Sequence, residues 1–160
     1  MYYCYVDTPI GELLLAGTEN ALSLIGFPKG SMRRDPRPDW IFKEEPFENV
    51  RQQLSEYFDG KRREFDIPLS LEGTKFQLSV WHELREIPYG TTVSYGEVAK
   101  RIDNPKAVRA VGAANGRNPI PIIVPCHRVI GSHGDLTGFG GGLDTKEALL
   151  RLEAEHTSLL

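Results

Sequence analysis

The sequence predicts a protein of the α/β (α+β) class, with a small antiparallel sheet and a helix in residues 1–73 and a mainly helical domain in residues 74–160. Short apolar runs separated by a turn fill the first 28 residues, which is typical of β-hairpins. Apolar side chains recur at helical spacing in much of the remainder, and Glu72-Gly73 offers a hinge between the two parts. A chain of 160 residues is long enough for one domain or for two small ones.

The N-terminal segment predicts a sheet of about three strands. Residues 2–6 alternate weakly between polar and apolar side chains, residues 8–11 (TPIG) form a tight turn, and residues 12–16 are mostly apolar. Residues 21–27 make a third apolar run, which Pro28 closes.

Three features lie between this sheet and the hinge. Residues 29–39 are rich in Gly, Pro, Arg and Asp and lack periodicity, so we expect an exposed loop. Residues 46–59 have apolar side chains at helical spacing, with Pro46 in the first turn and Gly60 after the last, and predict a helix whose aromatic stripe packs on the sheet. Residues 65–69 predict one more extended piece.

The second half opens with two predicted helices. Thr74 caps the first, and residues 88–90 (PYG) end it. Ser94 and Glu97 have the spacing of a capping box, in which each side chain satisfies the other residue's backbone N–H, and they begin the second helix.

The next predicted helix begins at Pro105, ends at Gly116 and is unusual for its small side chains. The tight turn before it gives this helix pair a winged-helix-like helix-turn-helix form. Arg109 is the one long side chain among the small residues, which are Ala107, Ala110, Gly112, Ala113 and Ala114. Such a surface could pack on another helix or enter a narrow groove of DNA, and the residues alone leave both interpretations open.

The charge of the chain is unevenly distributed. The net charge of −3 argues against a general polyanion binder, and residues 1–73 hold 9 Lys and Arg against 13 Asp and Glu. The segment from Lys100 to Arg128, however, has six basic residues, Arg117 among them, against one Asp. Such a stripe could contact a phosphate backbone, although a solvated helix face is the commoner explanation.

The stretch PIPIIVPCHRVIG, residues 119–131, holds Cys126 where an apolar run bends. His127 and Arg128 follow it, and nearby positive charge lowers the pKa of a thiol. A reactive nucleophile and an inert core cysteine are equally compatible with this composition. The only other cysteine is Cys4, so the sequence predicts neither a disulfide framework nor a zinc site.

Residues 131–142 contain six glycines and Phe139. This density predicts either a flexible loop or a pocket wall whose backbone approaches a flat ligand, with Phe139 as a stacking face. Residues 143–155 then predict a terminal helix, with Glu153 one turn beyond the inward-facing Leu149.

Several strings in the second half resemble the O6-alkylguanine-DNA alkyltransferases, also called methylated-DNA–protein-cysteine methyltransferases, which are suicide DNA-repair proteins. The strings are GTKFQLSVWHELREIPYG, TVSYGEVAKRI, NPKAVRAVGAANGRNP, IIVPCHRVIG and GGLDTKEALLRLE, and they cover about half of the chain. The first 73 residues match this family only in outline, as its small α/β domain.

The resemblance implies that the protein transfers an alkyl group from O6-alkylguanine in double-stranded DNA to Cys126, and that it also accepts O4-alkylthymine. Each molecule would react once, and no cofactor would be needed. The resemblance also implies that His127 is a base acting through a water, that Glu153 orients this histidine, and that Asn118 braces the active-site turn. A thiol needs a base, and the N–H of that base needs an acceptor, so a Cys-His-acid relay also agrees with general chemistry.

For DNA, the resemblance implies that Arg109 replaces a nucleotide flipped out from the minor groove, and that Tyr95 donates to N3 of the flipped base. Main-chain groups of Cys126 and Val129 would read the guanine edge. The other residues expected to contact substrate or DNA are Ala110, Ala113, Arg117, Pro121, Arg128, Phe139, Gly140 and Lys146.

The sequence departs from the family pattern at two positions. Many members have tyrosine where this chain has Phe139, and some have serine at Gly140, so we expect an altered pocket width and retained activity. The zinc ligands of some N-terminal domains are absent, because Cys4 is the only cysteine there and no histidine precedes His82.

Three other functions are less compatible with this sequence than repair. Alkyltransferase-like proteins bind alkylated DNA without repairing it and carry tryptophan in place of the cysteine. A papain-type hydrolase separates its cysteine and histidine widely in sequence. A helix-turn-helix transcription factor would have base-reading polar side chains where this chain has alanines.

The chain is also expected to be a cytoplasmic protein that does not bind membranes. Its N-terminus lacks a basic region, and its apolar run is too short for a signal peptide or a membrane span. We expect a monomer and leave cooperative binding along DNA open.

Overall fold

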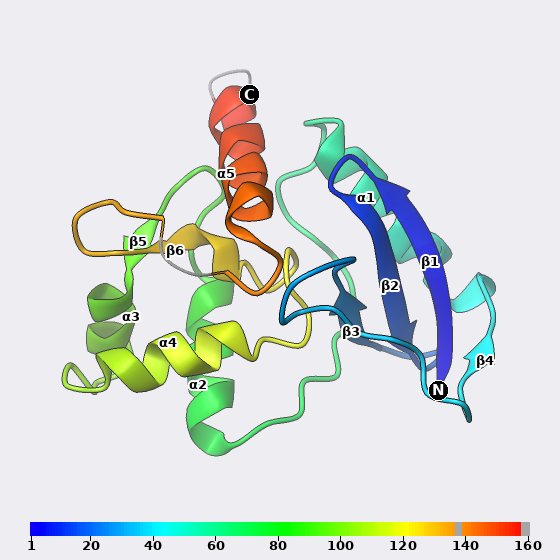
Figure 1. Cartoon of the computed structure of the whole chain (residues 1–160), viewed down its shortest axis with the longest axis horizontal. Helices are drawn as coiled ribbons and strands as arrows, with labels where there is room; N and C mark the ends of the chain where they lie inside the picture. Colours follow the sequence, from blue (N-terminus) through cyan, green and yellow to red (C-terminus); the bar gives the residue numbers. More distant parts are fainter. Residues whose placement is uncertain (137–138, 158–160) are drawn as a thin grey trace.

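The computed structural model describes residues 1–136 and 139–157, which form an N-terminal sheet backed by a helix and a helical C-terminal part (Figure 1). The predicted α/β (α+β) class is therefore confirmed. Of the glycines predicted to form a loop or pocket wall, Gly138 lies outside the described residues. No helix in the described ranges is long and apolar enough to cross a bilayer.

The N-terminal sheet has the strand order β3-β2-β1-β4. Strands β1 (Tyr2–Thr8) and β2 (Gly11–Gly17) pair antiparallel, and β3 (Leu22–Gly26) pairs antiparallel with β2. The turn between β1 and β2 is closed by Thr8, whose Oγ1 donates to the Gly11 carbonyl at 2.7 Å. Gly11 has φ +110°, which favours a residue without a Cβ. The three predicted strands are confirmed.

Both edges of the sheet hold segments that the sequence predicted incompletely. Strand β4 (Ile41–Phe42) pairs parallel with β1 and was not predicted, because two exposed residues carry no periodic pattern. On the other edge, the Leu22 N–H donates to the Pro68 carbonyl at 2.9 Å, and the Ser70 N–H donates to the Leu22 carbonyl at 2.8 Å. The expected extended piece at residues 65–69 thus lies along β3 but makes only a single bridge.

Helix α1 (Glu48–Phe58) packs on one face of the sheet and follows a 3-10 turn, η1 (Glu45–Phe47) (Figure 1). The helix predicted over residues 46–59 is confirmed, with its first turn in 3-10 form. Its buried face includes Tyr57, which is fully buried, so the predicted aromatic stripe does belong to the core.

The C-terminal part contains α2 (Lys75–Arg85), α3 (Tyr95–Arg101), α4 (Val108–Gly116) and α5 (Leu143–Thr157). The predicted cap at Thr74 is confirmed, and it forms a reciprocal capping box with Gln77. Two short strands, β5 (Val93–Ser94) and β6 (Val129–Ile130), pair parallel and bring the start of α3 beside the segment that follows Cys126.

The capping box predicted at the start of α3 is only half formed. Ser94 Oγ accepts from the Glu97 N–H at 3.0 Å, as expected. The Glu97 carboxylate instead accepts from Arg101 Nε at 3.3 Å, one turn along the helix. An ion pair on the exposed face thus replaces the second bond of the box.

Helix α4 begins at Val108, three residues later than predicted from Pro105. The reason is a hydrogen-bonded turn, in which the Ala107 N–H donates to the Asn104 carbonyl at 3.0 Å. Helices α3 and α4 pack against each other across this turn, which agrees with the predicted helix-turn-helix (Figure 1).

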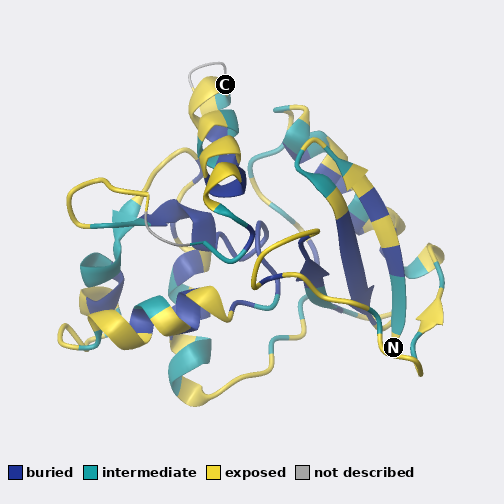
Figure 2. Cartoon of the chain, in the orientation of Figure 1, coloured by how far each residue is buried: buried dark blue, intermediate teal, exposed yellow. Residues whose placement is uncertain are grey.

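The buried side chains form one core that continues from the sheet into the helical part (Figure 2). The Ile25 N–H of β3 donates to the Pro119 carbonyl at 2.9 Å, and this bond ties the sheet to the segment that leads to Cys126. The Met32 N–H donates to the Gly140 carbonyl at 2.9 Å, and this bond ties the 29–39 loop to the glycine-rich segment. The N-terminal part therefore supports the segments on both sides of Cys126.

Candidate active site

Cys126 begins a one-turn 3-10 helix, η2 (Cys126–Arg128), at the end of a tightly folded apolar segment. Asn118 closes this segment, because its Nδ2 donates to the Val124 carbonyl at 2.7 Å and its Oδ1 accepts from the Ile120 N–H at 3.0 Å. Ile122 has φ +76°, a conformation that β-branched residues rarely adopt. The backbone before Cys126 is thus held in a strained bend that fixes the position of the thiol.

The Cys126 thiol is fully buried, and burial raises its pKa to about 11. A hydrogen bond with Asn118 and the charge of Lys146 act in the opposite direction but are weaker. Burial thus outweighs positive charge: Lys146 lowers this pKa, but the Arg128 side chain binds a carboxylate and burial lowers the pKa of His127. The thiol is protonated at neutral pH and needs a base in order to react.

The Glu153 carboxylate, on α5, is surrounded by hydrogen-bond donors. Its Oε2 accepts from the Tyr57 hydroxyl at 2.5 Å, from His127 Nε2 at 2.6 Å and from Arg128 Nη2 at 3.1 Å. Its Oε1 accepts from Arg128 Nε at 2.8 Å and from the Gly90 N–H at 3.1 Å. Burial acts to raise the pKa of Glu153, but the bonds and charges of His127 and Arg128 outweigh it and hold this pKa well below its usual range.

His127 lies in the same 3-10 turn as Cys126 and is fully buried beside Glu153. Because Glu153 is ionised, the proton of the neutral ring belongs on Nε2, which faces the carboxylate. Burial lowers the pKa of His127 against the opposing effect of Glu153. Nδ1 has no hydrogen-bond partner among the described residues, so its lone pair is free to accept a proton.

Two basic residues that were expected to contact substrate or DNA lie inside the protein. Arg128 is only 6% exposed, and besides Glu153 it binds the Ile87 carbonyl through Nη1 at 2.7 Å. Lys146 is 0% exposed, and its Nζ donates to the Val129 carbonyl at 2.6 Å. Both head groups are therefore engaged by interior partners in this structure, and their contact with substrate or DNA stays a prediction.

The remaining residues expected at DNA lie at or near the surface. Arg109, Ala110 and Ala113 on α4 are exposed, as is Arg117 just beyond it, and Tyr95 at the start of α3 is half-buried. The opposite side of α4 packs inward through Val111 and Ala114. The outer face of α4 therefore presents small side chains around Arg109.

The glycine-rich segment lies against the N-terminal loop. The Phe139 ring packs on Phe27, with the ring centroids 5.7 Å apart. A Cβ added at Gly140 would lie 2.3 Å from Met32 Cγ, so the close approach of the loop explains glycine where some relatives have serine. Pro121 is buried within the bend that precedes Cys126.

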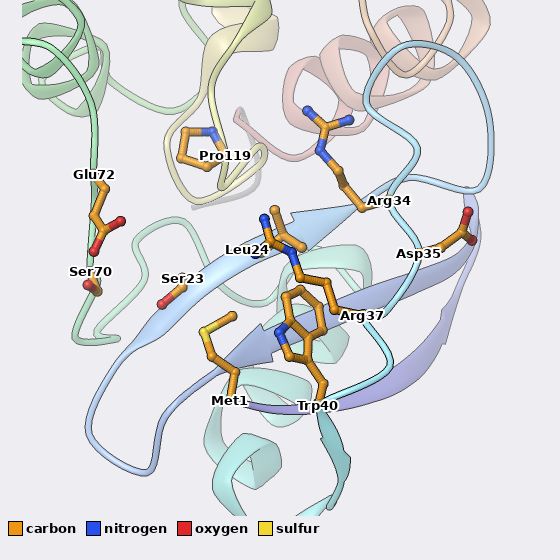
Figure 3. A pocket seen from close by; sticks show the side chains of 10 residues that line it. All are labelled: Met1, Ser23, Leu24, Arg34, Asp35, Arg37, Trp40, Ser70, Glu72 and Pro119. Atoms are coloured by element: carbon orange, nitrogen blue, oxygen red, sulfur yellow. The ribbon is translucent and has the colours of Figure 1, made fainter.

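Two open cavities have linings that do not include Cys126. One of about 450 Å³ lies beside the sheet, where Arg34, Arg37 and Trp40 surround it, and none of the predicted site residues lines it (Figure 3). Another of about 320 Å³ lies behind η2 and touches Pro125 and Arg128. Within residues 1–136 and 139–157, no group of three His, Cys, Asp or Glu side chains could hold a metal ion.

Comparisons with known proteins agree over both parts of the chain. The family model for the 6-O-methylguanine DNA methyltransferase DNA binding domain matches residues 75–155, and that for the ribonuclease-like domain of the same proteins matches residues 1–71. The chain belongs to the 6-O-methylguanine DNA methyltransferase family. The resemblance inferred from the sequence is thus confirmed.

Individual members of the 6-O-methylguanine DNA methyltransferase family match almost the whole chain. The methylated-DNA–protein-cysteine methyltransferase of Methanosarcina acetivorans is 56% identical over 153 residues, which are 96% of this chain and 98% of the relative. The crystal structure of Mycobacterium tuberculosis OGT in complex with DNA is 49% identical, with a TM-score of 0.93, and the match covers 98% of this chain and 94% of that one. A Methanococcus jannaschii methyltransferase structure, 26% identical with a TM-score of 0.66, covers 94% and 93%.

Three contacts of Glu153 were not predicted from the sequence: its hydrogen bonds with Tyr57 and with Gly90, and its ion pair with Arg128. Tyr57 lies 96 residues from Glu153 in sequence, and the helical stripe that contains it indicates only a core position. The buried pair could have been found, because an arginine within an apolar run needs a partner for its charge.

Proposed function

We propose that this chain repairs alkylated DNA by moving the alkyl group of O6-alkylguanine, and of O4-alkylthymine with it, to the sulfur of Cys126 in one irreversible turnover. The observation that carries this proposal is the buried contact of Glu153 with His127, next to a protonated thiol. Membership of the family and the likeness to an OGT bound to DNA support alkylated DNA as the substrate.

In the proposed reaction, His127 Nδ1 takes the proton of the Cys126 thiol through a water. The sulfur attacks the alkyl carbon, a C–S bond forms, and the C–O6 bond breaks with its electron pair going to the guanine. Tyr95 gives a proton to N3 of the leaving guanine and takes one back from solvent. His127 then releases to solvent the proton that it took from the thiol. Glu153 stabilises the imidazolium in the meantime.

The high pKa of Cys126 suits this proposed step. A thiol with a high pKa gives a more nucleophilic thiolate, and burial withholds that thiolate until His127 accepts the proton. The product is a thioether, which is a poor leaving group. The protein is therefore consumed by a single transfer.

A base within a duplex cannot reach a fully buried thiol, so the nucleotide must leave the stack, which costs a few kcal/mol. We propose that α4 enters the minor groove through Ala110 and Ala113, and that Arg109 fills the place of the flipped nucleotide. Arg117 would contact the backbone beside it. Binding of this kind is modest and salt-sensitive.

Main-chain groups would recognise the flipped base in this proposal. Main-chain groups of Cys126 and Val129 would read the guanine edge. Within the protein, the Cys126 carbonyl accepts from Asn115 Nδ2 and from the Val129 N–H, and the Val129 carbonyl accepts from Lys146 Nζ. Phe139 and Gly140 would border the base on one side, and Pro121 would line the pocket.

The alternative function is binding of alkylated DNA without repair, and the presence of a thiol at residue 126 favours repair. We also propose that the chain acts as a monomer in the cytoplasm, where its two unpaired cysteines suit a reducing compartment. The proposed boundary between its two domains lies at residues 73–74.

The test is transfer of a labelled methyl group from DNA that contains one O6-methylguanine. Cys126→Ser should abolish labelling and leave DNA binding intact, whereas Cys4→Ser should label normally. Cys4 is a matched control, because it is also buried and its pKa is also raised to about 11. Equal labelling of the parent and Cys126→Ser would overturn the proposal.

A further inference from the structure

We propose that Tyr57, on the helix of the N-terminal part, is a positioning residue for alkyl transfer that holds the Glu153 carboxylate against His127. The Tyr57 hydroxyl donates to Glu153 Oε2 at 2.5 Å, and the same oxygen lies 2.6 Å from His127 Nε2. This inference rests on the proposed function. It adds to the relay a residue from outside the C-terminal part of the chain, which carries Cys126, His127 and Glu153.

The position of the Tyr57 hydroxyl is fixed by the packing of its ring. The residue is 0% exposed, and its ring meets Phe58, Phe65 and Tyr89 at centroid distances of 5.2, 5.4 and 6.2 Å. Two of these contacts are edge-on, an arrangement that aromatic pairs prefer. A ring held on several sides can aim its hydroxyl with little freedom.

The carboxylate needs such a donor because Arg128 competes for it. The Arg128 guanidinium binds Oε1 through Nε at 2.8 Å and Oε2 through Nη2 at 3.1 Å. A bidentate arginine draws both carboxylate oxygens toward itself. Tyr57 approaches the oxygen that also meets His127, and its short bond keeps that oxygen within reach of the ring.

Without the hydroxyl, we expect Glu153 to turn toward Arg128 and to loosen its contact with His127. The imidazole would then be less firmly held with its proton on Nε2, and the free lone pair on Nδ1 would be less often in place to accept a proton. The N-terminal part of the chain would thus take part in the chemistry as well as in the fold.

The test compares two variants that each remove one hydroxyl from the same aromatic cluster. Tyr57→Phe should slow transfer from the free base O6-benzylguanine by about tenfold to a hundredfold, in the range expected for a misplaced catalytic group. Tyr89→Phe should react at the parent rate, because the buried Tyr89 hydroxyl has no hydrogen-bond partner among the described residues. The affinity of both variants for undamaged DNA should be unchanged, since neither residue lies on α4.

A magnetic resonance measurement on the parent protein tests the geometry without any variant. The Tyr57 hydroxyl proton and the His127 Nε2 proton share one acceptor oxygen, so both should resonate far downfield and show a mutual nuclear Overhauser effect. In Tyr57→Phe the His127 proton should shift, and in Tyr89→Phe it should not. A change that is merely structural would not move this one resonance selectively.

Three outcomes decide the inference. A folded Tyr57→Phe that reacts at the parent rate would overturn it, as would equal slowing in both variants or the absence of the shared signal in the parent protein. If the parent protein itself transfers no alkyl group to Cys126, the proposed function fails, whatever the resonances show.

Discussion

Replacing Glu153 by glutamine should damage both stability and alkyl transfer, for reasons that can be worked out from its contacts. The side chain is 1% exposed and is the only carboxylate in ion-pair distance of the buried Arg128 within residues 1–136 and 139–157. Glutamine offers one acceptor oxygen and a donor NH2 group. Whichever way the amide turns, Arg128 loses its counter-charge, and two donors or more lose an acceptor.

The expected magnitudes follow from these losses. Breaking a buried ion pair by removing one partner costs about 3–5 kcal/mol. For a chain of this size, that loss lowers the melting temperature by roughly 6–20 °C. Transfer should slow by about 10²–10⁴, the usual contribution of general-base catalysis, because the amide neither stabilises a charged His127 nor fixes its tautomer.

The two effects can be separated in one experiment. Single-turnover transfer from O6-benzylguanine is measured well below the melting temperature of the variant, where circular dichroism shows it to be folded. Glu155→Gln is the matched control, because it makes the same change at an exposed position on the same helix. A folded Glu153→Gln that reacts at the parent rate would refute the assignment of the relay.

The stability difference should also depend on pH. The pKa of Glu153 is depressed by folding, so the carboxylate stabilises the fold above its unfolded pKa of about 4.3 and loses this effect as the pH falls below that value. The gap in unfolding free energy between the parent and Glu153→Gln should therefore narrow from pH 5 downward to about pH 3. A gap that stays constant over this range would contradict the ionised state of Glu153.

Three further predictions test other parts of the site. The transfer rate should be constant from about pH 7 to 9. Over this range Cys126 stays protonated, because its pKa is about 11, and His127 stays neutral, because its pKa is lowered. A tenfold rise in rate per pH unit would mean that free thiolate reacts without the base. Arg109→Ala should slow repair of O6-methylguanine in a duplex far more than transfer from O6-benzylguanine, and equal losses would remove Arg109 from the flipping step. Gly140→Ala should lower the free energy of unfolding by about 1–3 kcal/mol through overpacking. Gly116→Ala should leave it unchanged, because a Cβ at Gly116 would meet nothing within 4 Å. Equal unfolding curves for the two variants would contradict the close approach of the loop at Gly140.

The sequence predicted those parts of the fold that depend on local patterns. The first hairpin, the helix near residues 46–59 and the cap at Thr74 follow from turn residues and apolar periodicity, which act over a few neighbours. Strand β4 and the late start of α4 depend on a partner strand and on a turn, and neither is written in the segment itself. The same limit applies to residues 65–69, whose bonding is decided by β3.

The candidate site was predictable to a similar degree. The strings around Cys126 and Glu153 identified the family, but composition left open whether Cys126 is a nucleophile or a core cysteine. Composition cannot weigh nearby charge against burial, and in the structure burial prevails and raises the pKa of the thiol. The basic residues Arg128 and Lys146 looked available for DNA, and only the three-dimensional fold shows that they serve interior partners. Tyr57 could not be found at all from sequence spacing.

The most direct test of the central proposal is the mass of the intact protein after incubation with an excess of DNA that carries O6-methylguanine. Every active molecule should gain one methyl group and then stop, and peptide mapping should find that group on Cys126. Continued turnover, a second methyl group, or a label on Cys4 would contradict single, irreversible transfer to Cys126.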